Sequence, residues 1–224
     1  DSFGCVTSAA AIVTGPPVLT ALISSSTNIF CNGACDGAAT AAASGGTVPY
    51  TYLWNDPGAQ TNAGAVNLCA GTYNVLVIDS NGCTDGTTVT LTQPNLLTAS
   101  TTPVAANCAG SCNGSASVLA AGGTVGYTYL WNDPGSQTTL NATGLCSGNF
   151  SVTVTDSKGC VATSLVTVSQ PPPLGSTMIN QTGVDCNGDC DGLAEVAASG
   201  GTSPYTFLWS NGQTAALAIN LCAG

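Results

Sequence analysis

An internal repeat constrains this chain more than any other feature. The segment Ser44–Thr61 (SGGTVPYTYLWNDPGAQT) returns as Ala121–Thr138 and, two residues shorter, as Ser199–Thr214. A second segment, Asn67–Cys83 (NLCAGTYNVLVIDSNGC), returns as Gly144–Cys160. The length differences fall in a turn and in proline-rich linkers, so each period is predicted to be one folded unit.

Cysteine positions give the length of the period. Cys31 and Cys108 are 77 residues apart, as are Cys69 and Cys146. Units of this size lie near the lower limit of what a core alone can stabilise. The predicted organisation is the end of a preceding repeat (1–17), two complete repeats (18–94 and 95–173) and an incomplete repeat that lacks its last strands (174–224).

Within a repeat, apolar and hydroxyl side chains alternate as they do in half-buried strands. The segment from Phe150 to Val154 (FSVTV) shows this period of two, and Asp56-Pro57-Gly58 is typical of a tight turn. We expect roughly seven short strands per repeat, which favours an all-β fold of tandem, small, immunoglobulin-like antiparallel sandwiches. A closed barrel is the alternative.

The charge composition excludes several functional classes. The 224 residues include one basic side chain, Lys158, eleven acidic ones and no histidine, for a formal net charge of −10. One lysine cannot neutralise a phosphate backbone, which excludes nucleic acid as a partner. Without histidine, neither a Ser-His or Cys-His nucleophile nor a mixed Cys/His zinc site can form. We therefore predict no enzymatic activity, no cofactor and, because no apolar run approaches bilayer length, no membrane insertion.

The order of the motifs resembles a known family. The strings C-N-G-x-C-D-G, G-G-T-x-P-Y-T-Y-L-W, N-L-C-A-G-T-Y-x-V-x-V-x-D-x-N-G-C and T-Q-P follow one another in the first repeat, and related strings follow in the same order in the later copies. Together they resemble the SprB repeat of giant cell-surface adhesins from gliding Bacteroidetes, and the second string is similar to the polycystic-kidney-disease-type immunoglobulin-like domain. The resemblance covers essentially the whole chain. It implies an extracellular protein at the bacterial cell surface, exported by the type IX secretion system, whose repeats form a long stalk.

Twelve cysteines at four per period indicate disulfides rather than metal sites, because paired zinc knuckles are absent. Spacing alone leaves three connectivities per repeat open. In the family that the chain resembles, the first cysteine and the Asn-Gly-Cys cysteine tend to occur even where the other two are absent. That resemblance implies the pairs Cys31–Cys83, Cys35–Cys69, Cys108–Cys160, Cys112–Cys146 and Cys190–Cys222. Cys5 and Cys186 are expected to pair outside the sequence, joining successive windows of a continuing array.

Three other groups of residues have both a functional and a structural interpretation. Asn187, Asp189 and Asp191 have the oxygen spacing of a calcium loop, but Ala198 stands where the bidentate glutamate would be, so a turn is favoured. Asp79 and Asp156 are expected to cap turns. The aromatic residues could stack on glycans, although their strict alternation in every copy favours a place in the core: Tyr50, Tyr52, Trp54, Tyr127, Tyr129, Trp131, Tyr205, Phe207 and Trp209.

These observations predict a structural stalk segment of a bacterial cell-surface adhesin used in attachment or gliding motility. Its expected partners are neighbouring repeats of the same array and, as a further candidate, surface glycans. Two other functions remain open, a subunit of a self-assembling extracellular filament or sheath and an array of carbohydrate-binding modules. If the strands run along the array, each repeat adds on the order of 35 Å.

Overall fold

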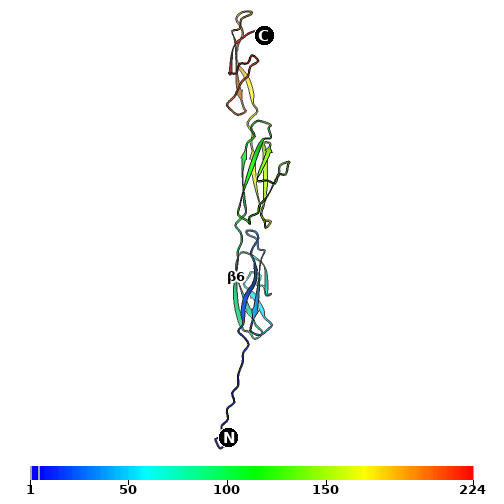
Figure 1. Cartoon of the computed structure of the whole chain (residues 1–224), viewed down its shortest axis with the longest axis vertical. Coiled ribbons are helices and arrows are strands. Elements are labelled where there is room, and N and C mark those ends of the chain that lie inside the picture. The colour runs from blue at the N-terminus through cyan, green and yellow to red at the C-terminus, as the bar shows by residue number, and fades with distance from the viewer. Residues whose placement is uncertain (1, 5, 224) are drawn as a thin grey trace. The chain divides into compact units, whose positions relative to one another are not determined.

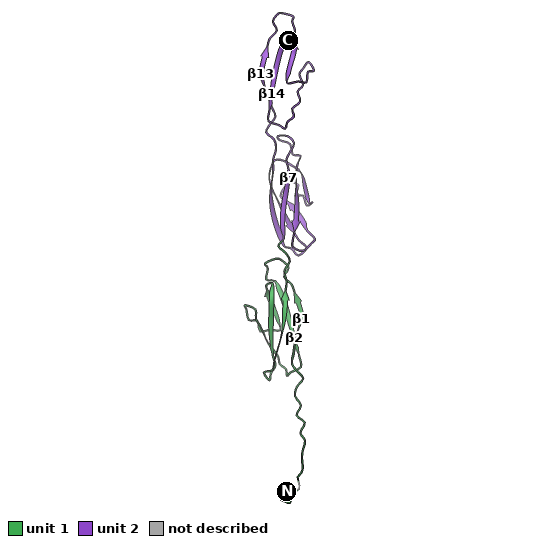
Figure 2. Cartoon of the chain, turned by 90° about the vertical axis from the view of Figure 1, so that its left-hand side faces the viewer, with its two compact units in different colours: residues 1–96 green, residues 97–224 purple. Residues whose placement is uncertain are grey.

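The computed structural model describes residues 2–4 and 6–223, and in that part of the chain it contains strands and no helix (Figure 1). It follows that the described residues include no helix long and apolar enough to cross a membrane. The chain divides into two compact units, residues 1–96 and 97–224, which Figure 2 colours separately.

The first complete repeat consists of two three-stranded antiparallel sheets. One sheet has the order β1-β2-β4 and the other the order β3-β5-β6. The strands are β1 (Thr20–Thr27), β2 (Gly37–Ser44), β3 (Thr51–Trp54), β4 (Gly64–Leu68), β5 (Gly71–Ile78) and β6 (Thr84–Leu91).

The second complete repeat has the same topology, with sheets β7-β8-β10 and β9-β11-β12. The third repeat has one sheet, β13-β14-β15, in the part that the structure describes. The strands are β7 (Thr98–Val104), β8 (Gly114–Ala121), β9 (Thr128–Trp131), β10 (Asn141–Leu145), β11 (Gly148–Thr155), β12 (Val161–Val168), β13 (Gly175–Thr182), β14 (Gly192–Ser199) and β15 (Leu217–Leu221).

This topology confirms the predicted fold class. In the letters of an immunoglobulin domain, β1-β2-β4 corresponds to strands A-B-E and β3-β5-β6 to strands C-F-G. The count of seven strands is wrong by one, because residues 55–63, where strand D would lie, form a loop. From this loop the Gln60 side chain accepts a hydrogen bond from the Val66 N–H and donates one to the Val66 carbonyl, where a neighbouring strand would otherwise pair.

Tryptophan fills the core of each complete repeat from its third strand, as predicted. The side chains of Trp54 and Trp131 are each 1% exposed. Trp54 packs in one cluster with Ala39 and Ala65, whose small side chains lie on the facing sheet. Tyr52 also packs against this cluster, and Tyr50 and Tyr52 are half-buried against a second one that includes Val77. The alternating aromatic residues therefore share one face of the strand.

Each complete sandwich has two distinct ends. At the leading end, where the chain enters, the Pro17 carbonyl accepts a hydrogen bond from the Gly46 N–H. At the trailing end, where the chain leaves, Asn32 donates to the Pro94 carbonyl and Gly33 donates to the Gln93 side chain. The chain thus crosses the length of the sandwich between its first and last residues.

Candidate functional site: the two ends of a repeat

A buried aspartate organises the leading end. The Asp79 carboxylate, 4% exposed, accepts hydrogen bonds from the backbone N–H groups of Thr47, Asn81 and Cys83. Burial raises the pKa of this carboxyl, but the hydrogen bonds outweigh burial and hold the pKa below its usual value. Gly46 has φ +56°, and a Cβ there would lie 2.7 Å from the Asp79 carboxylate, which explains the Gly-Gly pair of the repeat motif.

Asp156 makes the same contacts in the second repeat. It accepts from the N–H groups of Thr124, Lys158 and Cys160. The hydrogen bond from Thr124 is the largest influence that lowers the pKa of Asp156, against the opposing effect of burial. The predicted capping role of both aspartates therefore extends from the local turn to the loop that carries the Gly-Gly pair.

A second buried aspartate holds the loop after the core tryptophan. Asp56 accepts from the N–H groups of Gly58 and Gln60 and from the Gln60 side-chain amide. The bond from the Gln60 side chain is the main reason that the pKa of Asp56 is lowered. Asp133 and Gln137 repeat the arrangement. Burial is the largest single influence on the pKa of Asp133 and raises it, but the hydrogen bonds from Gln137 and Gly135 together outweigh burial, so the pKa is lowered.

These Asp–Gln pairs were missed by reasoning from the sequence. Asp56-Pro57-Gly58 was identified as a turn, and the glutamine was given no role. A usable signal was present, since an Asp-Pro-Gly-x-Gln string follows the tryptophan in both complete repeats and loses its aspartate in the shorter third copy. In that copy the Gln213 side chain still donates a hydrogen bond to the Ile219 carbonyl and accepts one from the Ile219 N–H.

Three of the predicted disulfides are present, one in each repeat. They are Cys35–Cys69, Cys112–Cys146 and Cys190–Cys222, with sequence separations of 34, 34 and 32 residues. In the first repeat the bond joins the loop before β2 to the turn between β4 and β5, next to the Gly37–Leu68 pair. Each bond therefore fastens the trailing end of its own sandwich.

The predicted pairs Cys31–Cys83 and Cys108–Cys160 are wrong. Cys83 and Cys108 are exposed free thiols. The physical reason is distance, because Cys31 lies at the trailing end and Cys83 follows β5 at the leading end. The eight residues of β5 run between those ends and span about 23 Å, whereas a disulfide needs Cα atoms within about 7 Å.

Two further cysteines were predicted to pair outside the sequence. Cys186 is an exposed free thiol in this structure, and its bond to a neighbouring window stays a prediction. Cys5 lies outside the described residues.

The segment predicted as a weak calcium candidate, Asn187, Asp189 and Asp191, contains a hydrogen bond that is typical of a turn. The Asp191 carboxylate accepts a hydrogen bond from the Asp185 N–H at 3.2 Å. Asp36 and Asn113 make the same contact in the first two repeats, with the N–H groups of Phe30 and Asn107. This equivalence across three copies supports the turn interpretation. No group of three or more His, Cys, Asp or Glu side chains suited to a metal ion is found among the described residues.

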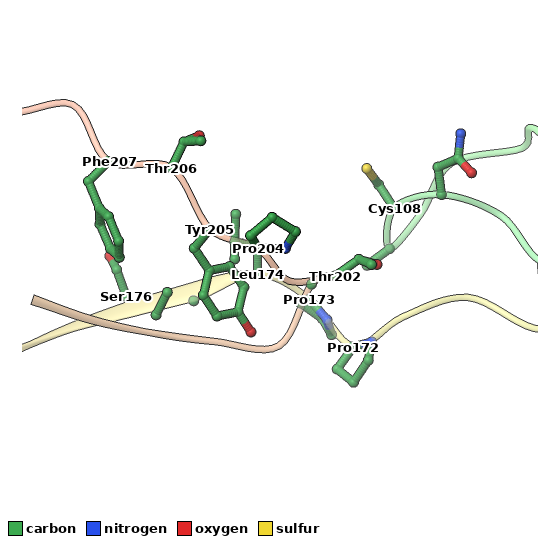
Figure 3. A pocket seen from close by; sticks show the side chains of 15 residues that line it. Cys108, Pro172, Pro173, Leu174, Ser176, Thr202, Pro204, Tyr205, Thr206 and Phe207 are labelled. Atoms are coloured by element: carbon green, nitrogen blue, oxygen red, sulfur yellow. The ribbon is translucent and has the colours of Figure 1, made fainter. Parts of the chain in front are cut away.

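An open groove of about 620 Å³ lies in the second unit, beside the start of the third repeat (Figure 3). Its lining includes Cys108, Leu174, Pro204, Tyr205 and Phe207. Tyr205 and Phe207 stand at the positions of Tyr127 and Tyr129 in the second repeat. Residues 107–109, Pro172 and Pro173 also line the groove, so it lies where the third repeat follows the second.

The prediction that the aromatic residues lie in the core therefore has one outcome in the two complete repeats and another in the third. In the first two repeats the tryptophans are buried and the tyrosines half-buried. In the third, Trp209 and Phe207 are half-buried and Tyr205 is exposed. The two complete repeats do not expose the equivalent tyrosines in this way. A glycan-binding surface present in every copy would expose the same aromatic residues in all of them, which is not observed in the described residues.

Several solved structures are similar to this chain. The three N-terminal domains of the highly immunogenic outer capsid protein of bacteriophage RB49 match at 13% identity and a TM-score of 0.43, covering 84% of this chain and 70% of that one. A Dscam structure matches at 14% and 0.31, covering 71% of this chain and 47% of that one. A tetra-tandem repeat from the extending region of a large adhesion protein matches at 14% and 0.26, covering 91% and 63%. This chain thus spans about half of the Dscam chain. No curated protein matches the sequence.

The family is shown by the sequence itself. The model of the SprB repeat matches residues 23–59, 98–136 and 179–214. Each match begins in or at the first strand of a repeat and ends in the loop after the core tryptophan. Together the three matches cover half of the 224 residues. The chain belongs to the SprB repeat family.

Proposed function

We propose that this chain is a stalk segment of a cell-surface adhesin, which carries adhesive parts away from the cell and serves attachment or gliding. The observation that carries the proposal is the passage of the chain through each sandwich from its leading end to its trailing end. A repeat with its termini at opposite ends adds length whenever a copy is added. SprB repeats themselves point to a structural, adhesin-like role at the cell surface.

The chemistry of the repeat suits a non-catalytic structural protein. The buried carboxylates of the two complete repeats, two in each, accept hydrogen bonds from backbone and amide N–H donors in loops: Asp56, Asp79, Asp133 and Asp156. Each repeat carries one internal disulfide, which is typical of small domains outside the cytoplasm. One lysine and no arginine also leave trypsin-like proteases a single cleavage site.

Surface display tests the proposal. Cells would carry the chain between a membrane anchor and a terminal peptide tag, and the height of the tag above the membrane would be measured by fluorescence. The full chain should hold the tag farther out than residues 18–94 alone, by on the order of 35 Å per additional complete repeat. Equal heights would contradict a stalk.

The same cells separate the stalk from a carbohydrate-binding array. A stalk without a terminal ligand-binding domain should leave attachment to glycan-coated surfaces unchanged. Attachment by the chain alone, lost in a Tyr205→Ala variant, would favour glycan binding and reject the proposal.

A further inference from the structure

Each repeat has a short strand at one edge of its A-B-E sheet. The strand β4 ends the sheet β1-β2-β4, and β10 and β15 end the equivalent sheets of the other two repeats. An edge strand presents backbone N–H and C=O groups that can pair with a strand of another molecule. The risk of such pairing is high in a repeat protein, because similar strands recur along the chain and in every other copy of it.

Proteins often protect such edges with charged side chains, above all lysine, which disfavour an approaching strand. This chain has a single lysine, Lys158, and no arginine. Lys158 lies in the turn between β11 and β12 and not on one of the three edge strands. These edges therefore need a protection that uses no positive charge.

The glutamine of each Asp–Gln pair supplies that protection. The Gln60 side chain accepts a hydrogen bond from the Val66 N–H and donates one to the Val66 carbonyl, both at 3.0 Å. It thus occupies the two backbone groups that a neighbouring strand would bond. Asp56 holds the glutamine in place by accepting from its backbone N–H and its side-chain amide. The Gln60 carbonyl accepts from the Trp54 N–H in β3, so the same residue also covers an edge of the facing sheet.

The contact with the edge strand recurs in every repeat. The Gln137 side chain bonds the N–H and the carbonyl of Thr143, and the Gln213 side chain bonds those of Ile219. The third copy lacks two residues of this loop and its aspartate, and it nevertheless keeps the contact. The three copies therefore share the hydrogen bonds to the edge strand and not the shape of the loop.

A bulge next to the glutamine contact limits pairing further along each strand. Asn67 has φ +56°, and at this point the register of β4 against β2 shifts between Gly37 and Ala38. Gly144 and Asn220 have the same left-handed conformation at the equivalent points of β10 and β15. Bulges of this kind twist an edge away from a partner strand. The glutamine therefore covers the regular part of a strand that the bulge interrupts.

We propose that these glutamines substitute for a neighbouring strand and keep the edges of β4, β10 and β15 from pairing with the same edges of a second copy of the chain. The excluded association is antiparallel pairing of two E strands, which would join two A-B-E sheets into one across a two-fold axis. This inference concerns how copies of the chain are kept apart, and it stands whether or not the chain serves adhesion.

Replacing the glutamines by leucine tests the proposal on the full chain. The triple variant Gln60→Leu, Gln137→Leu and Gln213→Leu keeps a side chain of similar size and removes both side-chain hydrogen bonds from every edge. Free thiols would be alkylated first, so that no disulfide forms between molecules. In sedimentation equilibrium the variant should associate at least about tenfold more strongly than the wild-type chain. A folded triple variant that associates no more than the wild type would overturn the proposal.

The matched control is the double variant Gln93→Leu and Gln170→Leu. These glutamines also accept hydrogen bonds from backbone N–H groups, those of Gly33 and Gly110, but in loops and not at a sheet edge. The control should associate no more than the wild-type chain. Association equal to that of the triple variant would overturn the proposal.

A lysine on each edge separates strand pairing from exposure of the core. The changes Val66→Lys, Thr143→Lys and Ile219→Lys, at exposed positions, would be added to the triple variant. They should return its association to the wild-type level, because like charges would face each other across a paired edge. Association that the lysines do not reduce would come from another surface and would overturn the proposal.

Hydrogen exchange of the wild-type chain gives a readout that needs no variant. The N–H groups of Val66 and Thr143 donate to glutamine side chains, whereas the Ala41 N–H donates to the Ala63 carbonyl within the sheet. The amides of Val66 and Thr143 should nevertheless exchange as slowly as that of Ala41, because the glutamines cover them. Exchange at the rate of an unprotected amide would show an open edge and overturn the proposal.

Discussion

The second and third repeats share their motifs but differ in how well they bury them. Trp131, in β9, is 1% exposed, whereas Trp209, which lies outside the strands of the third repeat, is half-buried. Val118 is buried in β8, and its counterpart Val196 in β14 is half-buried. The third repeat nevertheless keeps the A-B-E sheet and the internal disulfide. It also keeps the hydrogen bond from the Gln213 side chain to the Ile219 carbonyl. The described part of the third repeat thus keeps the A-B-E sheet without a C-F-G sheet, and its core positions are less buried than those of the second repeat.

The core tryptophans should show the largest difference. Trp131→Ala is expected to lower the free energy of unfolding of the second repeat by about 3–5 kcal/mol, the usual cost of removing a buried aromatic side chain. Trp209→Ala should cost the third repeat much less, because its side chain is already partly solvated. Urea titration followed by hydrogen-exchange mass spectrometry reports each repeat separately.

A matched control for Trp131→Ala is Leu130→Ala on the opposite, solvent-facing side of β9, where the side chain is 52% exposed. It should change stability by no more than about 0.5 kcal/mol. Equal costs for the two tryptophans would show that the third repeat has a buried core of its own.

The disulfides should not follow the difference in burial. Replacing Cys112 and Cys146 by alanine, or Cys190 and Cys222, should each cost about 2–4 kcal/mol, because a disulfide acts mainly on the unfolded chain and the two loops are of similar length. The same titration measures both effects. Cys108→Ala, which removes an exposed free thiol, is the control. If loss of the disulfide lowered the free energy of unfolding strongly only in the second repeat, the stabilisation would come from packing and not from the unfolded chain.

Acid should destabilise the complete repeats more than the third one. The folded-state pKa values of Asp133 and Asp156 are depressed, so the stability they contribute is fully present above the unfolded pKa, about 3.9, and is lost as pH falls from about 5 through the folded values. Residues 174–223 contain no counterpart of either aspartate. Urea midpoints at pH 6 and pH 3 measure the difference.

The variants Asp133→Asn and Asp156→Asn test the cause of that acid sensitivity. Each should flatten the pH dependence of the second repeat and leave that of the third unchanged. A parallel loss of stability in all repeats of the wild-type chain would locate the acid sensitivity elsewhere.

The smallest expected effect concerns a tyrosine hydroxyl. Tyr127 donates to the Gly122 carbonyl at 2.6 Å in a partly buried site, and Tyr205 makes the equivalent bond to Gly200 in an exposed one. Tyr127→Phe should cost about 0.5–1.5 kcal/mol, and Tyr205→Phe less, because water replaces an exposed bond. Thermal unfolding of the two variants makes the comparison, and a larger cost for Tyr205→Phe would contradict it.

Much of the fold could be predicted because its signals are local and repeated. Alternation identified the strands, and recurrence identified Trp54 and Trp131 as core residues. The cysteine pairing could not be obtained in full, because it depends on which end of a sandwich each loop occupies. Cys35 and Cys69 share an end, whereas Cys31 and Cys83 do not. Burial of Asp56 and Asp133 depends on Gln60 and Gln137 closing a loop in place of a strand.

Small-angle X-ray scattering measures whether each complete repeat adds length to the chain. Residues 18–94, residues 18–173 and the full chain would be compared under oxidising conditions. The account predicts that the maximum dimension grows by on the order of 35 Å from residues 18–94 to residues 18–173, with a further increase in the full chain. A maximum dimension that stays nearly constant while the mass doubles would mean that the repeats fold back on one another, and would contradict the account.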